Sequence, residues 1–431
     1  MPAAVASAEI VAQSATHGYY ERRPPVRLCE DHAIAAIDLT TSPNDANPHA
    51  LFHELRALAP VHWSDVHRAW LAVSHEAVNA GLRDPWLSSE RIPSFERVAA
   101  QRPPAFANVV DLLRGWMVFH DPPTHDRLRD PVRRVFTPMR LERLAPMIEA
   151  TVDELLDRAA DAGTGDLRPL LTTPLPALVI ADLLGVPRAD RERFQDWSDQ
   201  LAHVVFSAEV AGTDSEVAIG AAEHFTSYFG DLIDERRRRP GDDVISALVE
   251  ASDAGGPSAQ ELVGACTLLL FAGHETTSGL LANGTCVLLE QEVARAQLLD
   301  DPSRWSVAVD ELLRFEGPAK LMARKATADR AWFGAEVRAR DTVFLVILAA
   351  NRDPDVFAGP DTFDVTRDPN PHFGFGWGLH HCLGAALARL EARITLRRLF
   401  ERFPKLQLND SVRWGGGVIG RTVWSVPVSM R

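Results

Sequence analysis

The sequence predicts a mainly α-helical protein with small β-sheets at its side, built as one large domain. Apolar residues recur at helical spacing in four segments: 51–59, 140–160, 198–237 and 258 to about 290. Strand-like runs are short and mostly late: 61–63, 70–73, 343–348 and 422–428. No linker rich in Pro, Gly or Ser divides the chain after residue 40. We therefore expect a flexible N-terminal tail over residues 1–37 and one domain over 38–431.

Composition narrows the class of protein. The chain has 431 residues, of which 46% are hydrophobic and 24% charged, as in globular proteins. Its formal net charge of −14 argues against nucleic acid as a partner. No apolar run approaches the roughly 18–20 residues that span a bilayer. The N-terminus also lacks the charged start and compact apolar stretch of a signal peptide, so we expect a cytoplasmic protein without membrane association.

The four cysteines show no spacing typical of a disulfide framework or a zinc ribbon: Cys29, Cys266, Cys286 and Cys382. Cys266 and Cys286 lie in apolar helical surroundings, where a free cysteine behaves as a small core residue. Cys382 differs, because glycine, histidine and aromatic residues surround it.

The segment around Cys382 has the features of a ligand-binding turn. Four glycines bracket the cysteine: Gly374, Gly376, Gly378 and Gly384. Glycine permits positive φ and a close approach of the backbone to a flat ligand. A helix over 385–400 would place Cys382 near its N-terminus, where the dipole favours a thiolate. Two alternatives stay open at this point: an inert cysteine in a turn, or a zinc site with His380 and His381, although adjacent residues converge poorly on a tetrahedral ion.

The long helix predicted from a capping box at Ser258 and Glu261 carries unusual residues at its centre. They are Ala272, Gly273, His274, Glu275, Thr276 and Thr277. Glycine and β-branched hydroxyl residues are poor choices inside a helix, which indicates a functional site. A threonine bonded back to a carbonyl could open a notch for O2 and water, and a hydroxyl beside a carboxylate could relay protons. Taken alone, a solvated Glu275 and a neutral Thr276 explain the segment better.

Together the two segments resemble the cytochrome P450 superfamily, in its bacterial soluble form. The haem-binding signature Phe-x-x-Gly-x-x-x-Cys-x-Gly is matched by Phe375, Gly378, Cys382 and Gly384. Five residues that follow also fit the bacterial form: Ala385, Leu387, Ala388, Arg389 and Glu391. Trp377 departs from the His or Arg of many relatives, and His381 stands where an aromatic residue is common. The resemblance covers residue 40 to the end, roughly.

The resemblance implies the P450 fold and a haem-thiolate enzyme. Cys382 would be the axial ligand of the iron, whose thiolate favours cleavage of the O–O bond. Glu275 and Thr276 would form the acid–alcohol pair that delivers protons. Ala272 and Gly273 would leave room above the iron, while the role of His274 stays open.

The resemblance also implies partners for the haem and a structural ion pair. His125, Arg129, Arg324 and His380 would bind the haem propionates, and Phe375 and Gly384 would contact the cofactor. For His125 and Arg129, which share a helix face, the alternative is a solvated basic surface. Glu311 and Arg314 would form a buried pair joined by Arg367, with a role in folding, where the alternative is an ordinary surface ion pair.

The function implied is monooxygenation. One atom of O2 would enter a small organic substrate by hydroxylation, epoxidation or O/N-dealkylation, with haem b as cofactor. Two electrons would come ultimately from NAD(P)H, through a ferredoxin or flavodoxin-type donor or a fused reductase. The alternatives are a gas sensor or electron carrier, or a peroxide-using enzyme on the same fold, which would not need the proton relay.

The substrate pocket is expected to be lined by five segments: 86–118, 184–229, 269–274, 319–322 and 417–419. Residues after Pro318 are expected to be extended, so alternate side chains would face opposite sides. We expect Ala319 and Leu321 to face the pocket and Lys320 to point outward, to a propionate or solvent. The alternative is an inward Lys320 that pairs with an anionic group of the substrate.

Overall fold

A computed structural model describes residues 37–187, 190, 197, 200–201 and 214–430 of the chain. Residues 1–36, which make up nearly all of the expected tail, and the first half of the expected helix 198–237 lie largely outside these ranges. Ile37 and Leu39 are buried in a hydrophobic cluster with Phe52, so the packed part of the described chain begins at its first residue.

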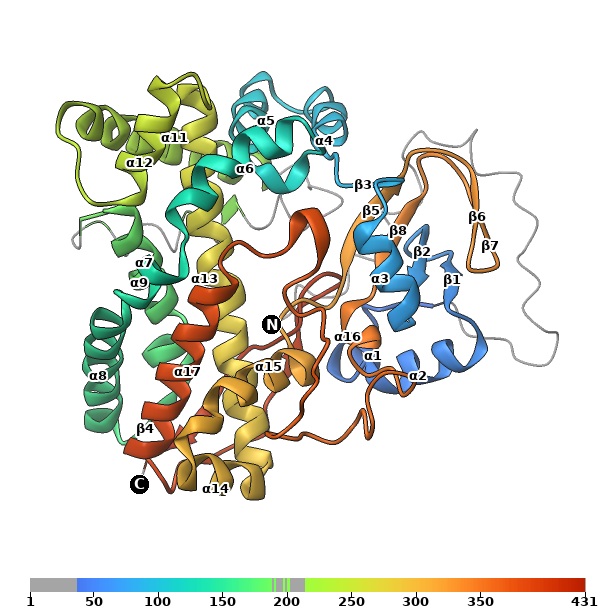
Figure 1. Cartoon of the computed structure of the whole chain (residues 1–431), viewed down its shortest axis with the longest axis vertical. Helices are drawn as coiled ribbons and strands as arrows, with labels where there is room; N and C mark the ends of the chain where they lie inside the picture. The colour runs from blue at the N-terminus through green and yellow to red at the C-terminus, as the bar shows by residue number, and fades with distance from the viewer. Residues whose placement is uncertain (1–36, 188–189, 191–196, 198–199, 202–213, 431) are drawn as a thin grey trace.

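Helices form the larger part of the molecule, and the largest sheet lies at one side of them (Figure 1). The main helices are α4 (Ile92–Ala99), α5 (Ala107–Leu113), α6 (Thr124–Val135), α7 (Pro138–Glu142), α8 (Ala145–Ala162), α9 (Pro174–Leu184), α11 (Asp214–Arg238), α12 (Val244–Asp253), α13 (Ala259–Glu290), α14 (Glu292–Asp300), α15 (Trp305–Glu316) and α17 (Ala385–Arg402). Four other helices accompany the largest sheet: α1 (Ser42–Ala46), α2 (His49–Leu58), α3 (His75–Arg83) and α16 (Ile347–Ala350). The predicted mainly α class with small sheets is confirmed.

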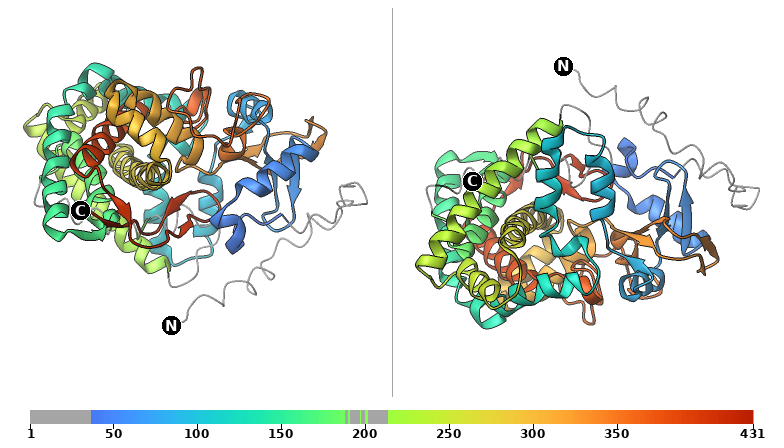
Figure 2. Two further views of the ribbon diagram at one scale, coloured as in Figure 1. Left: turned by 90° about the horizontal axis from the view of Figure 1, so that it is seen from below. Right: turned by 90° about the horizontal axis from the view of Figure 1, so that it is seen from above.

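Helix α13 is the axis around which the helical part is built. Its 32 residues span about 48 Å, and the predicted capping box of Ser258 and Glu261 is present at its start. Figure 2, where α13 is seen close to end-on, shows the other helices arranged around it. Helices α5, α9, α11, α15 and α17 all contact α13. Because the middle of α13 is enclosed on these sides, a side chain placed there faces the interior of the molecule.

The largest sheet has five strands in the order β1-β2-β8-β5-β3. They are β1 (Val61–Ser64), β2 (Ala69–Ala72), β3 (Leu87–Ser88), β5 (Met322–Ala326) and β8 (Thr342–Leu345). A hairpin of β6 (Arg330–Trp332) and β7 (Ala335–Val337) extends from it. The smaller sheets join β4 (Thr164–Asp166), β12 (Pro427–Ser429) and β9 (Gln407–Leu408), and separately β10 (Trp414–Gly415) and β11 (Thr422–Val423).

Two predicted strands end earlier than expected. The apolar run 343–348 leaves the sheet after Leu345, and the chain turns into the short helix α16. The run 422–428 is divided between β11 and β12. A continuous apolar run has no period that separates a buried strand from a buried helix, which is why the sequence did not predict the break.

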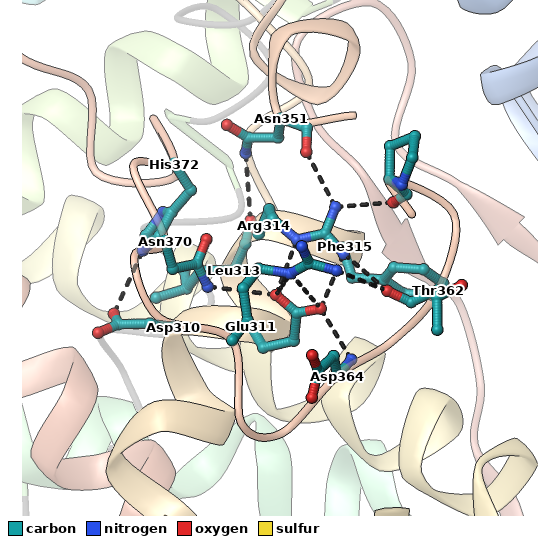
Figure 3. A network of polar contacts seen from close by, with 12 residues as sticks. Asp310, Glu311, Leu313, Arg314, Phe315, Asn351, Thr362, Asp364, Asn370 and His372 are labelled. Atoms are coloured by element: carbon teal, nitrogen blue, oxygen red, sulfur yellow. Dashed lines mark hydrogen bonds and ion pairs between the residues drawn. The ribbon is translucent and has the colours of Figure 1, made fainter. Parts of the chain in front are cut away.

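The predicted ion pair of Glu311 and Arg314 is buried, and the alternative of a surface pair is wrong. Both side chains have 0% exposure, and two hydrogen bonds of 2.7 Å join them. Arg367 Nε donates to Glu311 Oε2 at 3.1 Å, as expected. Figure 3 shows the Arg314 guanidinium pointing also to the backbone carbonyls of Asn351 and Thr362. The network therefore fixes the long loop that leads from α16 to Cys382.

Candidate active site

The loop before α17 holds Cys382 through its own backbone. The Cys382 N–H donates to the carbonyl of Phe375 at 2.9 Å. Gly376 and Gly378 have φ of +64° and +71°, and a Cβ on Gly378 would lie 2.8 Å from the carbonyl oxygen of Leu82. Gly384 differs, because its φ is −83° and no heavy atom lies within 4 Å of an added Cβ. The space over Gly384 belongs to a cavity.

That cavity measures about 1210 Å³, including the space at its mouth, and lies between α13 and the cysteine loop. From α13 it is lined by Leu268, Leu269, Ala272, Gly273, Thr276, Thr277 and Leu280. From the cysteine loop and α17 it is lined by Gly374, Phe375, His380, His381, Cys382, Leu383, Gly384, Leu387, Ala388 and Glu391. The two segments that the sequence singled out therefore face one space.

The Cys382 side chain is open to the cavity although it lies deep within the molecule. Burial raises the pKa of its thiol, and the Gly384 N–H with Arg129 and Arg389 acts in the opposite direction. Cys266 and Cys286 are core residues, as predicted, and burial raises the pKa of each to about 12.

At the centre of α13, only part of the predicted group reaches the cavity. Thr276 lines it, and Thr276 Oγ1 donates to the Ala272 carbonyl at 2.8 Å, as the sequence suggested. Gly273 lines it too, but an added Cβ would lie 3.2 Å from Ile180, so this glycine also permits close packing of α9. Glu275 and His274 are not among the lining residues, and His274 Nε2 lies 3.4 Å from Glu275 Oε1.

Basic side chains gather at one side of the cavity. The rings of His125, on α6, and His380, on the loop, lie 4.4 Å apart in a T-shaped contact. His125 Nε2 and His380 Nε2 are both buried, and neither has a hydrogen-bond partner among the described residues. Burial, together with Arg324, His125 and Arg129, lowers the pKa of His380 to about 3. The alternative of a solvated basic surface is therefore wrong for His125, which is fully buried.

Two arginines complete this group. Arg129 donates to the carbonyl of His381 at 2.6 Å. Arg324 on β5 is buried, and among the described residues it donates only to the carbonyl of Ala323. Burial and the nearby charge of Arg91 lower its pKa to about 10. Arg91 donates to the same carbonyl, and the sequence did not single it out. Among the described residues no carboxylate forms an ion pair with these arginines, so the group can accept an anion.

Lys320 points away from the cavity, but not to solvent or to the basic group. Ala319 and Met322 line the cavity, whereas Leu321 is buried in the core cluster that contains Ile37. Lys320 has 0% exposure, and its ammonium donates to Asp45 at 2.8 Å and to the Gly417 carbonyl at 2.5 Å. Lys320 therefore points away from the pocket, as expected. The expectation that it meets a propionate or solvent is wrong, and so is the expectation that Leu321 faces the pocket together with Ala319.

The expected pocket segments are correct in part. Met117 and Val118 line the cavity from 86–118, and Leu269, Ala272 and Gly273 line it from 269–274. Segment 417–419 does not line it; Val418 and Ile419 pack instead against the core cluster of Ile37. Within 184–229, no described residue lines the cavity, and much of this segment lies outside the described residues.

Comparison with known proteins decides the family. The sequence model of the family described as Cytochrome P450 matches residues 306–412. The cytochrome P450 monooxygenase PikC of Streptomyces venezuelae is 38% identical over 401 residues, covering 90% of this chain and 92% of PikC. The chain belongs to the cytochrome P450 family. This P450 is therefore an enzyme of the monooxygenase class, with haem as its cofactor.

Solved structures of P450s have the same fold. The myxobacterial CYP267B1 in complex with myristic acid has a TM-score of 0.84 and 37% identity, covering 91% of this chain and 98% of that one. P450BioI, in complex with an acyl carrier protein ligated to hexadec-9Z-enoic acid, has a TM-score of 0.82 and 32% identity, covering 89% of this chain and 99% of P450BioI. Among the described residues of this P450, no helix is both long and apolar enough to cross a membrane.

The residues that line the cavity of this P450 are chemically suited to haem. Cys382 offers sulfur at the cavity wall, and Gly384 leaves a space that a Cβ would fill. The basic group has unpartnered imidazole nitrogens and buried guanidinium groups, which suit the two carboxylates of haem. The rest of the wall is mainly apolar, as a flat porphyrin requires.

Proposed function

We propose that this P450 is a haem-thiolate monooxygenase in which Cys382 binds the iron and Thr276 helps to deliver protons where O2 reacts. One atom of O2 enters a small organic substrate, the other leaves as water, and two electrons and two protons are consumed. The observation that carries this proposal is that Cys382 and Thr276 line the same cavity from different elements. When bound, haem supplies the iron that activates O2, and a thiolate ligand favours cleavage of the O–O bond.

In this proposal the basic group orients the cofactor. The unpartnered Nε2 atoms of His125 and His380 would donate to the propionates, and Arg129 and Arg324 would hold the propionates as cations. An anion there would also offset the cost of keeping Arg324 charged while buried. Phe375 and Gly384 line the cavity beside Cys382 and would contact the cofactor there.

Proton delivery belongs to α13. The Thr276 hydroxyl gives its hydrogen to the Ala272 carbonyl, so its lone pairs are available to a water molecule in the cavity. Ala272 and Gly273 keep the α13 wall small beside it. Glu275 lies outside the lining and is partly exposed, so it would exchange protons with solvent and pass them to water beside Thr276.

The test of the function is the spectrum of the reduced carbon monoxide complex. Wild type should give the red-shifted Soret band typical of thiolate ligation, and Cys382→Ala should lose it. Cys266→Ala is the matched control, because Cys266 is a buried core cysteine that does not line the cavity. A histidine-type spectrum in freshly purified wild type would sink the proposal.

We further propose that electrons arrive over the cysteine loop, from a ferredoxin or flavodoxin-type donor reduced by NAD(P)H. Trp377 and Leu379 on this loop are 44% and 43% exposed, and the Arg83 guanidinium lies 5.0 Å from the Trp377 ring centroid. Arg389 is another partly exposed cation beside the loop, over Phe375. Exposed apolar side chains beside the Arg83 cation suit an acidic partner protein, although Arg389 is itself paired with Asp310 and the whole chain has a net charge of −14.

A plant-type [2Fe–2S] ferredoxin with its NADPH-dependent reductase tests this surface. Trp377→Ala should slow reduction of the haem, and added salt should slow it in wild type. Trp424→Ala is the control, because Trp424 is also exposed, at 59%, but lies on the C-terminal segment. Equal rates for the two variants would contradict the assignment.

For the substrate we propose an apolar, chain-like molecule. The α13 wall presents Leu268 and Leu269, and Met117, Val118 and Ile180 line the cavity beside it. The similar CYP267B1 was solved with myristic acid and P450BioI with a fatty acid on a carrier protein. Titrating the ferric protein with myristic acid and its methyl ester, read by the haem spectrum, tests the proposal. No spectral change with either compound would contradict it.

A further inference from the structure

Asp310, on α15, contacts the chain on both sides of the cysteine loop. Its Oδ1 accepts a hydrogen bond from Arg389 Nε, on α17, at 2.8 Å. The same oxygen lies 3.3 Å from His372 Nε2, and Figure 3 shows the His372 ring pointing to Asp310. Cys382 lies between His372 and Arg389 in the sequence. One carboxylate oxygen therefore holds the chain before and after the proposed ligand of the iron.

Hydrogen bonds on two sides fix the hydrogen of the His372 ring. His372 Nδ1 accepts from the Gly374 N–H at 3.0 Å, so this nitrogen carries no hydrogen. The ring hydrogen is therefore on Nε2, from which it points to Asp310 Oδ1. The side chain of His372 is only 5% exposed, so water has little access to either bond. Asp310 thus orients the ring that holds the backbone of Gly374, a residue of the cavity wall.

Arg389, the other partner of Asp310, covers an aromatic ring of the loop. Its guanidinium lies 4.5 Å from the centroid of the Phe375 ring, within the range of a cation–π contact. The Phe375 carbonyl in turn accepts the Cys382 N–H at 2.9 Å. The side chain of Arg389 is 40% exposed, and a long exposed side chain has many rotamers to sample. The bond to Asp310 keeps the guanidinium over Phe375.

Both contacts depend on Asp310 alone. Burial raises the pKa of this carboxyl, but the hydrogen bonds from His372 and Arg389 outweigh it, so the pKa lies below its usual value. Asp310 is therefore ionised at neutral pH, which strengthens both bonds. Among the residues that the structure describes, neither His372 nor Arg389 forms an ion pair with another carboxylate.

We propose that Asp310 is a positioning residue for the ligand of the iron. Its Oδ1 holds His372 and Arg389, and these two side chains fix the cysteine loop. The proposal rests on the proposed function, because it requires Cys382 to bind the iron. It gives Asp310 a different role from the neighbouring Glu311, which belongs to the buried ion pair and stabilises the chain as a whole. Without Asp310, Cys382 should leave the iron before the chain unfolds.

The test follows the haem spectrum and the fold of the haem-loaded protein in one guanidinium series. The red-shifted Soret band of the reduced carbon monoxide complex reports thiolate ligation, and far-ultraviolet circular dichroism reports the helices. In Asp310→Ala the band should be lost at a lower denaturant concentration than the helices. In mild denaturant the band should decay about tenfold faster than in wild type, the effect of losing one hydrogen bond to a charged group. A band that decays at the wild-type rate would overturn the proposal.

Asp310→Asn separates the position of the oxygen from its charge. Both hydrogen bonds go to Oδ1, and the asparagine side chain offers a neutral oxygen at the same place. The band of Asp310→Asn should therefore decay at a rate much closer to wild type than to Asp310→Ala. Equal decay in the two variants would contradict positioning by this oxygen. If Asp310→Ala does not fold, His372→Phe and Arg389→Met each remove one of the bonds, and each should speed the decay.

Asp153→Ala is the matched control. Asp153, on α8, also accepts hydrogen bonds from an arginine of α17, which is Arg398, at 2.7 and 2.8 Å. Arg398 lies further along α17 from the cysteine loop, so this variant should leave the decay of the band unchanged. The same change in Asp153→Ala and Asp310→Ala would refute a specific role for Asp310. A wild type without the thiolate band would refute the proposed function as well, whereas an unaltered Asp310→Ala would refute this inference alone.

Discussion

Replacing Arg314 by methionine should destabilise the haem-loaded protein by about 3–5 kcal/mol, the usual cost of breaking a buried ion pair. Methionine retains much of the apolar volume but none of the donors. Arg314 gives two hydrogen bonds of 2.7 Å to Glu311 and three more to backbone carbonyls, at 2.8–3.0 Å. All five are lost at once in a place that is 0% exposed.

Two features of the site change the expected loss of stability in opposite directions. Glu311 keeps the Arg367 guanidinium at 3.1 Å and the Asp364 N–H at 2.9 Å, so its charge is not left alone. Three buried carbonyls lose a partner, at about 1–3 kcal/mol each where water does not replace it. For 431 residues, an unfolding entropy near 2.1 cal/mol/K per residue gives roughly 0.9 kcal/mol/K, so we expect Tm to fall by about 3–6 °C.

Guanidinium unfolding followed by circular dichroism measures the difference, with thermal scans alongside. Arg158→Met is the matched control, because Arg158 pairs with Glu154 on an exposed helix face and should cost less than about 0.5 kcal/mol. The two variants should have equal slopes in denaturant, since they expose similar surface on unfolding. A loss below about 1 kcal/mol for Arg314→Met, or one equal to the control, would refute a stabilising role for this pair.

Four further outcomes are expected. Thr276→Ala should keep haem but divert electrons to peroxide, and it should slow proton delivery by on the order of 10²–10⁴. Thr267→Val is the control and should leave product formation unchanged, because the Thr267 hydroxyl also donates to the carbonyl four residues earlier but does not line the cavity. Unchanged coupling of electrons to product in Thr276→Ala would count against the relay. Arg324→Met should release haem faster to an apo-globin acceptor, and an unchanged release rate would remove it from the propionate site. Despite burial, neighbouring cations lower the pKa of Glu316 to about 2 from 4.5, so its stabilisation is present above pH 4.5 and lost as the pH falls toward 2; acid unfolding of Glu316→Gln should vary less over this window. Lys320→Met should bind aromatic acids as wild type does, because the ammonium is held in a buried pair away from the cavity; a loss confined to acids would contradict this.

Local patterns predicted the parts of the site that depend on one segment. The capping box fixed the start of α13, and the positive φ of Gly376 and Gly378 follows from their place in a tight loop. The resemblance to P450s predicted that Cys382 and Thr276 face one cavity, and they do. The spacing of the residues alone did not decide this. Each of these inferences depends on the chemistry of a few consecutive residues.

Contacts between distant segments were not predictable in the same way. Lys320 N–H donates to the Ile419 carbonyl, and the regular strand β5 begins only at Met322. The residues between Pro318 and β5 therefore follow irregular pairing, and Ala319 and Met322, three apart, face the same side. The alternation rule applies to a pleated strand, and nothing in this segment marks where the pleat begins. The partner of Lys320, Asp45, lies 275 residues away, beyond any local pattern.

The threonines of the two helices illustrate why residue type alone identifies a site incompletely. Thr276 drew attention because a β-branched hydroxyl is a poor helix residue, but it satisfies its hydrogen in the ordinary way, on the carbonyl of Ala272. Thr395 drew none, although its buried hydroxyl lacks a partner among the described residues. Whether the Thr395 hydroxyl finds a partner depends on the packing of α17 against its neighbours. That packing joins segments more than a hundred residues apart, so the unpaired hydroxyl could be found only in the folded chain.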